Sequence, residues 1–359
     1  ADVNGNLLSK PSGGVTRAMV SGSGGTIDIN LRGNISVVGT GAYGIYAQSG
    51  VQDTLGALDP TRNGGAITIR HEGSIFSSGN GGAAIRVEGG DKDRYNEIVL
   101  ASGSTIAALS GAAILGTFGK EFVTNQGSIY GNINLVDGYA DRDEQNIFSN
   151  SGLYHTNASG SVDLGKNGAF INHGVVAVGG QNSIGTTTVR TGVFNQAPFA
   201  TLAVDVNSTA LTSYPKSDLL VIRGNADLSG KVGVNVMGGL RPENFRIITA
   251  TGTLRENLTA SGPEAAPFVW QTIRNGNAIE IRPDARFVPV QGWATTDSER
   301  SMMGYLQKAW AAGAADPEVA GLFGAFAGVD SAAEYMRGID SLVPDESSSS
   351  LTAQTTNAR

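Results

Sequence analysis

The chain has 359 residues, of which 51 are glycine and 16% are charged, and its formal net charge is −7. Glycine is thus used about twice as often as the roughly 7% of average proteins, and charged residues fall below the usual share of about 25%. The acidic balance excludes a basic nucleic-acid-binding face, and the lack of cysteine excludes disulfides and thiolate metal sites. No run reaches the about 18 consecutive apolar residues of a membrane-spanning helix.

A short phrase, Asn-x-Gly followed by apolar residues, recurs along the first half of the chain. Its clearest copies begin at Asn125, Asn150 and Asn172. Successive glycines are 40, 30, 24, 25 and 22 residues apart, and they are Gly33, Gly73, Gly103, Gly127, Gly152 and Gly174. Self-similarity at this spacing is typical of stacked structural units. We expect these glycines to line one corner of the stack, where the Asn side chains form hydrogen bonds from turn to turn.

Each early unit contains three short alternating segments separated by glycine turns. The segments of the first three units are 25–31, 33–37 and 44–47, then 66–69, 73–75 and 84–87, then 97–100, 103–106 and 113–115. In the first of them Ile27 and Ile29 face one side and Asp28 faces the other. The pattern predicts an all-β fold, a right-handed parallel β-helix with three-stranded rungs over residues 1–190.

Two polar insertions, 48–63 and 88–96, lengthen the early units and predict loops that project from one corner. Binding residues are often carried by loops on a rigid scaffold. The candidate binding residues are Asp53, Asp59, Arg62, Asp91, Lys92 and Arg94. The alternative interpretation is that both insertions are tolerated surface loops.

From residue 191 to residue 282 the strands lengthen and predict a cap of different construction. Segments 202–206 and 231–236 alternate, whereas 218–222 and 245–249 are dense apolar runs. Asn275-Gly276 predicts a type I′ β-hairpin that covers the open edge of the last turn.

Residues 283–344 predict a linker followed by helices. A capping box at 296–299 opens the first helix, which runs to about Ala312. Asp316 followed by Pro317 opens a second, and a third begins near Asp330 and ends before Pro344. Residues 345–359 form a polar tail.

Residues 217–230, read as S-D-L-L-V-I-R-G-N-A-D-L-S-G, resemble the D-L-x-v-x-G-x-a-x-l-x-G signature of bacterial autotransporter (type V secretion) passenger domains. The apolar runs 232–236 and 245–249 follow it, and the phrase at 170–176 resembles the stalk repeats of that family. The resemblance implies a pertactin-like junction, or autochaperone, that caps the β-helix near the membrane. It further implies that the helices lead towards a translocator barrel.

This resemblance implies a non-enzymatic, cofactor-free protein at the cell surface of a Gram-negative bacterium, serving adhesion or cell aggregation. Its partners would be its own translocator barrel, the outer-membrane assembly machinery and the surface of a host or neighbouring cell, with no nucleic acid. Because no barrel follows Arg359, we expect a released or excised passenger. The junction would fold first and draw the chain outward, with a nucleus of Asp218, Leu219, Leu220, Val221, Ile222, Gly224, Gly230, Val232, Val234, Ile247 and Ile248.

Two other functions stay open. A polysaccharide-degrading β-helix enzyme, a lyase or glycosidase, would need paired carboxylates or a basic residue beside carboxylates in a groove. The residues that share a face under this alternative are Asp28, Asp53, Arg70, Glu72, Arg86 and Glu88. The chain would otherwise be a stalk whose functional head lies upstream. The histidines show no metal-ligand spacing, and the four carboxylates of 137–144 are interpreted as a solvated turn, with calcium as the alternative.

Overall fold

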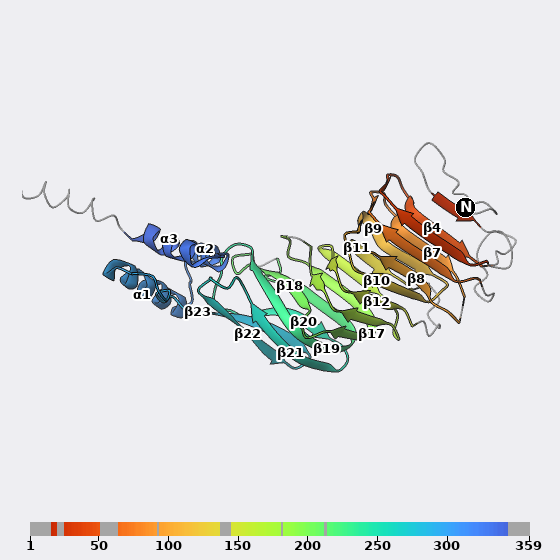
Figure 1. Ribbon diagram of the computed structural model, residues 1–359. Coiled ribbons are helices and arrows are strands. Elements are labelled where there is room, and N and C mark those ends of the chain that lie inside the picture. Colours follow the sequence, from red (N-terminus) through yellow and green to blue (C-terminus); the bar gives the residue numbers. More distant parts are fainter. Residues whose placement is uncertain are drawn as a thin grey trace, which may run out of the picture.

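The computed structural model describes residues 16–19, 25–50, 64–91, 93–136, 145–180, 182–211 and 214–343. Most of this part of the chain is β-strand, and three helices lie at its C-terminal end, as expected for an all-β fold followed by a short helical segment. The strands form one continuous hydrogen-bonded system. Figure 1 shows an elongated molecule with the first strands at one end and the helices at the other.

The described strands number 23. The earlier ones are β1 (Thr16–Met19), β2 (Ile27–Arg32), β3 (Ile35–Val37), β4 (Tyr43–Ser49), β5 (Ile67–Glu72), β6 (Ser74–Ser77), β7 (Ala83–Gly89), β8 (Asn96–Leu100), β9 (Thr105–Thr117), β10 (Glu121–Asn125), β11 (Ser128–Asn134) and β12 (Ile147–Asn150). The later ones are β13 (Leu153–His155), β14 (Ser159–Asp163), β15 (Ala169–Asn172), β16 (Val175–Ala177), β17 (Thr186–Gln196), β18 (Thr201–Val206), β19 (Leu219–Val236), β20 (Phe245–Ala250), β21 (Leu254–Ser261), β22 (Phe268–Asn275) and β23 (Ala278–Ala285).

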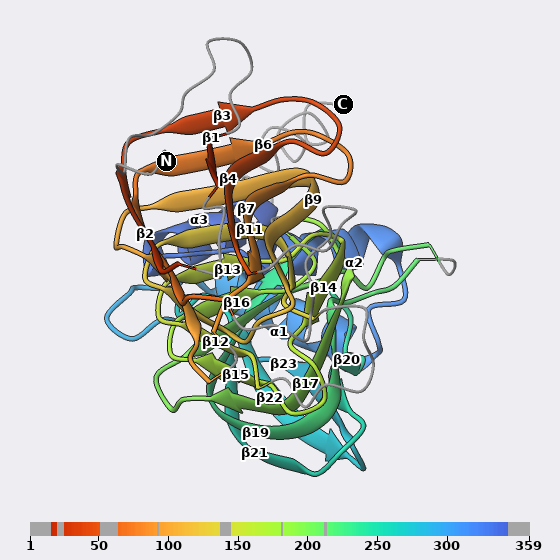
Figure 2. The ribbon, with the colours of Figure 1, turned by 90° about the vertical axis from the view of Figure 1, so that its right-hand side faces the viewer.

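The strands up to β21 stack in three parallel columns. The first column contains β2, β5, β8, β10, β12 and β15, the second contains β3, β6, β13, β16 and β18, and the third contains β1, β4, β7, β14 and β20. The long strands β9, β11, β17, β19 and β21 pass from one column to the next. Paired residues lie between 19 positions apart, for Ile114 and Ile133, and 40 apart, for Ile27 and Ile67. Figure 2 shows the successive layers, from β3 and β6 down to β19 and β21.

Apolar side chains from all three columns fill the space between them. In the first column Phe148, Phe170 and Phe194 are completely buried, and successive ring centroids lie 4.8 and 4.5 Å apart. Tyr154 packs edge-on against Phe148 at 5.2 Å. Burying such a side chain contributes roughly 1.5–3 kcal/mol. This interior continues as one cluster into residues 191–282, called the junction below, and into the helices.

The expected glycine corner lies between the first and second columns. The amide of Leu153 donates to the carbonyl of Gly127, and that of Val175 donates to the carbonyl of Gly152. A Cβ atom added at Gly174 would overlap the Gly152 carbonyl, so the layers approach too closely for any side chain there. The expectation is wrong by one residue in the third copy. There Ser104, and not the expected Gly103, occupies the corner position.

A ladder of buried amides confirms the expected hydrogen bonding from layer to layer. Asn125 Nδ2 donates to Asn150 Oδ1 at 2.8 Å, and Asn150 Nδ2 donates to Asn172 Oδ1 at 2.9 Å. Asn172 Nδ2 donates to Gln196 Oε1 at 3.3 Å, and Gln196 Nε2 ends the ladder on the carbonyl of Ser229 at 2.9 Å. The same column of inward positions holds Leu100 before the ladder and Leu228 after it, in the strands paired with Asn125 and Gln196.

An antiparallel hairpin closes the end of the stack. β23 pairs antiparallel with both β20 and β22, so the edge of the third column is covered as expected. The expected turn type is wrong. Asn275 pairs with Ala278, which places Gly276 and Asn277 at the centre of the turn, and positive φ occurs at Gly276 (+60°) but not at Asn277. That is the pattern of a type II′ turn, with glycine at the first central position.

The three described helices begin where their capping residues predict. They are α1 (Asp297–Ala311), α2 (Pro317–Ala327) and α3 (Ala332–Leu342). Thr296 and Glu299 form the capping box of α1, Asp316 caps α2 before Pro317, and Ser331 caps α3. No helix among the residues that the structure describes is long and apolar enough to cross a bilayer.

The helices pack directly on the hairpin end of the stack. Phe323 of α2 lies 5.2 Å from Trp310 of α1 and 5.6 Å from Phe287, measured between ring centroids. The amide of Leu240 donates to the carbonyl of Ala320 at 2.8 Å. The helical segment therefore shares its core with the junction.

Candidate functional site

The signature segment begins just before β19, with Ser217 and Asp218, and continues into β19, which passes through all three columns. Its first part pairs with β17 and β20 in the third column, its middle with β21 in the first, and its end with β18 in the second. The two bends fall at Gly224 and Gly230. A Cβ at Gly224 would overlap the carbonyl of Thr191, and Gly230 has a φ of +87°. Glycine is favoured at both places because of this close approach and this left-handed conformation. The spacing of the two signature glycines is thus the length of one strand between two corners.

The apolar residues expected to form the folding nucleus divide between two faces. The side chains that reach the interior are those of Leu220, Ile222, Val232, Val234, Ile247 and Ile248. Leu219 and Val221 alternate with them and are only partly buried. Leu220 pairs in register with Ile248, and Val232 pairs with Leu202, so the interior residues are contiguous across neighbouring layers. Their order of folding stays a prediction.

Asp218 is completely buried and joins two segments of the stack. Its Oδ1 accepts from the backbone amide of Gly185 at 2.7 Å, and its Oδ2 accepts from the amide of Asp205 at 2.7 Å. Burial raises the pKa of the Asp218 carboxyl to about 8, although the two amide donors act in the opposite direction. The neighbouring Asp205 carboxylate also raises this pKa. Because no solvent reaches it, this carboxyl is suited to holding backbone and not to reacting with a substrate.

Asp205 extends the same network to two further segments. Its Oδ1 accepts from Asn235 Nδ2 at 2.7 Å, and its Oδ2 accepts from the amide of Ser183 at 3.1 Å. The two carboxylates together connect the segments around residues 183–185, 205, 218 and 235. The sequence signature contains the Asp218 position, but its partners lie 13 and 33 residues away and no local pattern identifies them.

The candidate binding loops are described only in part. Asp91 and Arg94 lie in a short turn, where the amide of Arg94 donates to the carbonyl of Asp91 at 3.3 Å. Asp53, Asp59, Arg62 and Lys92 lie outside the described residues. The bases of the two insertions are adjacent, because the amide of Gly64 donates to the carbonyl of Gly90 at 2.9 Å. Both insertions therefore leave from the same corner, as expected.

An arginine lies over two tyrosine rings on the outer face of the third column. Arg86 is 4.9 Å from the ring centroid of Tyr43 and 5.3 Å from that of Tyr46. Burial disfavours its charge, but the neighbouring Glu88 carboxylate, with which it forms an ion pair, raises the pKa of Arg86. The guanidinium lies over the ring of each tyrosine, so these two rings do not form an exposed aromatic surface on which a ligand could stack.

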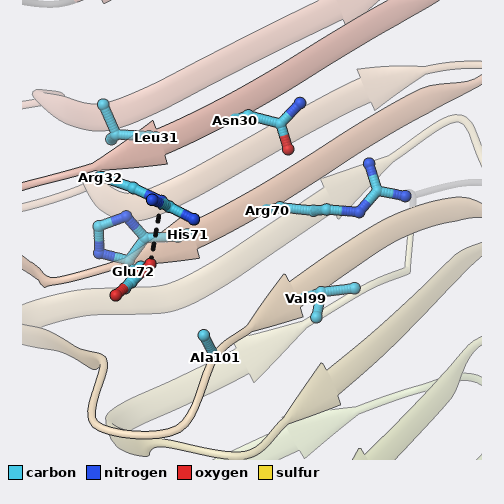
Figure 3. A pocket seen from close by; sticks show the side chains of 8 residues that line it. All are labelled: Asn30, Leu31, Arg32, Arg70, His71, Glu72, Val99 and Ala101. Carbon is cyan, nitrogen blue, oxygen red and sulfur yellow. Dashed lines mark ion pairs between the residues drawn. The ribbon is translucent and has the colours of Figure 1, made fainter.

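A groove of about 210 Å³ lies beside the first column, at the ends of β2, β5 and β8. Figure 3 shows the side chains that line it, including Arg32 on β2 and Arg70, His71 and Glu72 on β5. Arg32 Nε lies 3.1 Å from Glu72 Oε2. Val99 lines the side formed by β8.

His71 is 1% exposed, and neither ring nitrogen has a hydrogen-bond partner among the described residues. Burial lowers the pKa of His71, and the nearby backbone of Gly73 and Leu31 acts in the opposite direction. Sequence reasoning missed this residue. The available signal was its alternation with Ile67 and Ile69, which places all three on the inward face of β5.

The other histidines take part in ring stacking. His155 stacks on Tyr130 with ring centroids 5.1 Å apart, and His173 stacks on Phe199 at 5.7 Å, so the two histidines do not stack on each other. Burial lowers the pKa of His155, opposed by the Asp205 carboxylate. No group of three metal-ligating side chains occurs in the part of the chain that the structure describes, and residues 137–144 lie outside it.

Searches with protein-family models and against curated proteins give no match to this chain. The assignment of a function therefore depends on the residues and on their arrangement.

Proposed function

We propose that this chain is the passenger domain of a bacterial autotransporter, wound as a right-handed parallel β-helix with three-stranded rungs and closed by a junction and helices. Under this proposal it is a non-enzymatic, cofactor-free stalk displayed at the surface of a Gram-negative bacterium, where it serves adhesion or aggregation. Its partners are its translocator barrel, the outer-membrane assembly machinery and a host or neighbouring cell surface.

The construction of the junction carries this proposal. The resemblance to the passenger signature rests on Asp218, Gly224 and Gly230, and each has a specific role in closing the stack. Asp218 anchors two backbone segments, while the glycines allow the bends between columns. Each of these signature residues therefore has a structural part in closing the stack, which a chance similarity of glycine-rich strands would not require.

The parallel registers support the proposed winding. The strands pass through the three columns in the same order in each layer. The chain between one strand and the next strand of the same column is therefore a crossover connection between parallel strands. About 98% of such connections are right-handed. A stack of this kind can nucleate at one end and propagate layer by layer. That property suits export without an external energy source, because folding outside the membrane then opposes return of the chain.

The groove beside His71 also argues against the glycosidase alternative. Glycoside hydrolysis generally requires two carboxyl groups about 5–9.5 Å apart across the scissile bond. Of the side chains that line the groove, Glu72 alone is a carboxylate, and it is paired with Arg32.

Refolding kinetics test the nucleating junction. Leu220→Ala in the junction and Ile69→Ala in the early stalk remove comparable apolar side chains from sites that are both completely buried. Each substitution should cost about 2–5 kcal/mol. If the junction folds first, L220A slows refolding from urea by about tenfold or more, whereas I69A leaves the refolding rate nearly unchanged and accelerates unfolding. Equal slowing by both variants, or slowing by I69A alone, would contradict the nucleating role.

Cellular location has a separate test. Protease added to intact cells that express the natural gene should cleave the chain, and it should do so before the outer membrane is permeabilised. Protection of the chain until the cells are lysed would exclude surface display, whatever the refolding result.

A further inference from the structure

The dipeptide Asn-Gly recurs in this sequence, at Asn4, Asn63, Asn80, Asn167 and Asn275. In this dipeptide the side-chain amide of asparagine lies next to a main-chain nitrogen that no following Cβ atom shields. That nitrogen can attack the side-chain carbonyl carbon, so each copy is a candidate for spontaneous deamidation. Asn4 and Asn63 lie outside the described residues, and the structure distinguishes the other copies from one another.

The copy at Asn275 is open to the reaction. Asn275 and Gly276 are both exposed at the turn between β22 and β23, and no atom lies within 4 Å of the place that a Cβ on Gly276 would take. The amide of Gly276 forms no hydrogen bond within the part of the chain that the structure describes. Asn275 Nδ2 lies 3.4 Å from Glu280 Oε1, beyond the usual range of about 2.7–3.2 Å for such a bond. Neither the attacking nitrogen nor the side chain is therefore firmly held.

The copy at Asn167 is the same dipeptide in a closed environment. Gly168 is buried, and its amide donates to the carbonyl of Gly165 at 3.2 Å. A Cβ on Gly168 would overlap the carbonyl of Leu164. Attack by the Gly168 nitrogen therefore requires this turn to open first, and only the opened fraction of the molecules can react.

The copy at Asn80 combines features of both. Gly81 is exposed, and a Cβ there would meet no atom within 4 Å. The carbonyl of Asn80, however, accepts from the amide of Gly41 at 2.8 Å, which restricts rotation of the peptide group that must move during ring closure. We expect its rate to lie between those of the other two copies.

The reaction requires water and no other reagent. The main-chain nitrogen of Gly276 loses its proton to solvent and bonds to Cγ of Asn275, while the side-chain nitrogen takes a proton from solvent and leaves as ammonia. Water then opens the resulting succinimide ring. Breaking the bond from the Gly276 nitrogen to Cγ gives aspartate. Breaking its bond to the main-chain carbonyl carbon gives isoaspartate, in which the main chain passes through the former side chain.

Both products affect a contact within the hairpin. Glu280 is 8% exposed, and its carboxylate accepts from Asn244 and Arg246 as well as from Asn275. Either product replaces the amide donor of Asn275 by a carboxylate, which cannot donate and which repels Glu280. Isoaspartate also lengthens the main chain, and turn length fixes the register in which Asn275 pairs with Ala278.

We propose that Asn275 converts spontaneously to aspartate and isoaspartate in the folded protein, and that this conversion loosens the pairing of β22 with β23. Because β23 also pairs with β20, the closure of the stack weakens with the age of the molecule. This proposal does not depend on surface display or on the mode of export.

Mass spectrometry after incubation of the folded protein in mildly alkaline, heavy-oxygen water tests the reaction. Label from the solvent separates conversion during incubation from conversion during later digestion in ordinary water. Asn275 should take up label about tenfold or more faster than Asn167, because about 1.4 kcal/mol of opening free energy gives a factor of ten. In urea both should react at similar rates, since neither is protected. Absence of label at Asn275 in the folded protein overturns the proposal. So does the same preference for Asn275 in urea, which would assign the difference to neighbouring sequence.

Two variants connect the reaction to the hairpin. Asn275→Gln retains an amide but needs a larger ring to react, so it should stay unconverted. Asn277→Gln, in the same turn, leaves the Asn275-Gly276 pair intact and should react like the wild type. After incubation, the amides of residues 278–281 should exchange hydrogen about tenfold faster in the wild type and N277Q, as expected for the loss of one bond to a charged group, and at the original rate in N275Q. Unchanged exchange in converted wild type, or equal acceleration in N275Q, overturns the proposed loosening.

Discussion

The side-chain carboxyl group of Asp218 accepts a hydrogen bond from the backbone amide of Asp205, 2.7 Å away, inside the junction. Burial raises the pKa of Asp218 from 3.8 to about 8. The folded protein thus retains the proton up to about pH 8, whereas the unfolded chain releases it near pH 3.8. The contribution of this group to stability is fully present below pH 3.8 and is lost as the pH rises towards 8.

We therefore predict that Asp218→Asn removes a pH-dependent part of the stability. An amide offers one acceptor atom to two N–H donors, so the variant loses one hydrogen bond at every pH. Its urea midpoint should lie below that of the wild type at pH 4, and the difference should shrink as the pH approaches 8. Parallel curves for the two proteins between pH 4 and 8 would show that Asp218 does not titrate in this window.

The amide ladder predicts a large effect of a single buried asparagine. Asn150→Ala removes the acceptor of Asn125 and the donor to Asn172 and to the carbonyl of Val175. We expect a loss of about 2–3 kcal/mol in the free energy of unfolding, measured by urea denaturation. Asn34→Ala is the control, because exposed Asn34 accepts a cross-layer bond from the amide of Ser74 at 2.9 Å. It should cost about 0.5 kcal/mol or less. Similar losses for both variants would contradict the importance of burial.

Two glycines predict opposite responses to the same change. Gly174→Ala forces a methyl group onto the carbonyl of Gly152 and should destabilise the protein by about 1–3 kcal/mol. Gly321 lies in α2, and a Cβ there would meet no atom within 4 Å. Gly321→Ala should therefore stabilise the protein by about 0.5–1 kcal/mol through helix propensity. The midpoints of thermal unfolding of the two variants test both expectations. An unchanged midpoint in G174A would mean that the layers can move apart at this corner.

The aromatic contacts of α2 predict how the helices detach. Phe323→Ala removes the ring between Trp310 and Phe287 and should cost about 3–5 kcal/mol. We expect faster proteolysis between residues 286 and 296 and a red shift in tryptophan fluorescence, while the β-sheet circular dichroism signal is retained. Tyr305→Ala on α1 is the control, because this side chain is 60% exposed. Loss of the β-sheet signal in F323A would show instead that the stack requires the helices.

Features fixed by neighbouring residues could be predicted from the sequence. The helix caps follow local rules, so Thr296, Asp316 and the start of α3 were located within a residue or two. Alternation placed Ile67 and Ile69 inward for the same reason. The asparagine phrase also indicated the ladder, because its spacing repeats.

Features that depend on how layers align could not be read in this way. His71 obeys the same alternation, but its lack of partners depends on Leu31 and Leu100, which are 40 and 29 residues away. The offset at Ser104 likewise comes from the length of the preceding turns, and apolar content alone did not separate buried Leu220 from partly buried Leu219. The register between layers decides each of these cases.

Between Asn125 and Gln196, each layer is joined to the next by the same contact, a hydrogen bond between two side-chain amides. Leucine occupies the paired position just beyond each end of the ladder, at Leu100 and at Leu228. A layer of 22 to 25 residues inserted or deleted between these ends would leave both terminal contacts as they are. The protein can thus be lengthened or shortened in this region, by evolution or by engineering, through added or removed layers and without changes to either end.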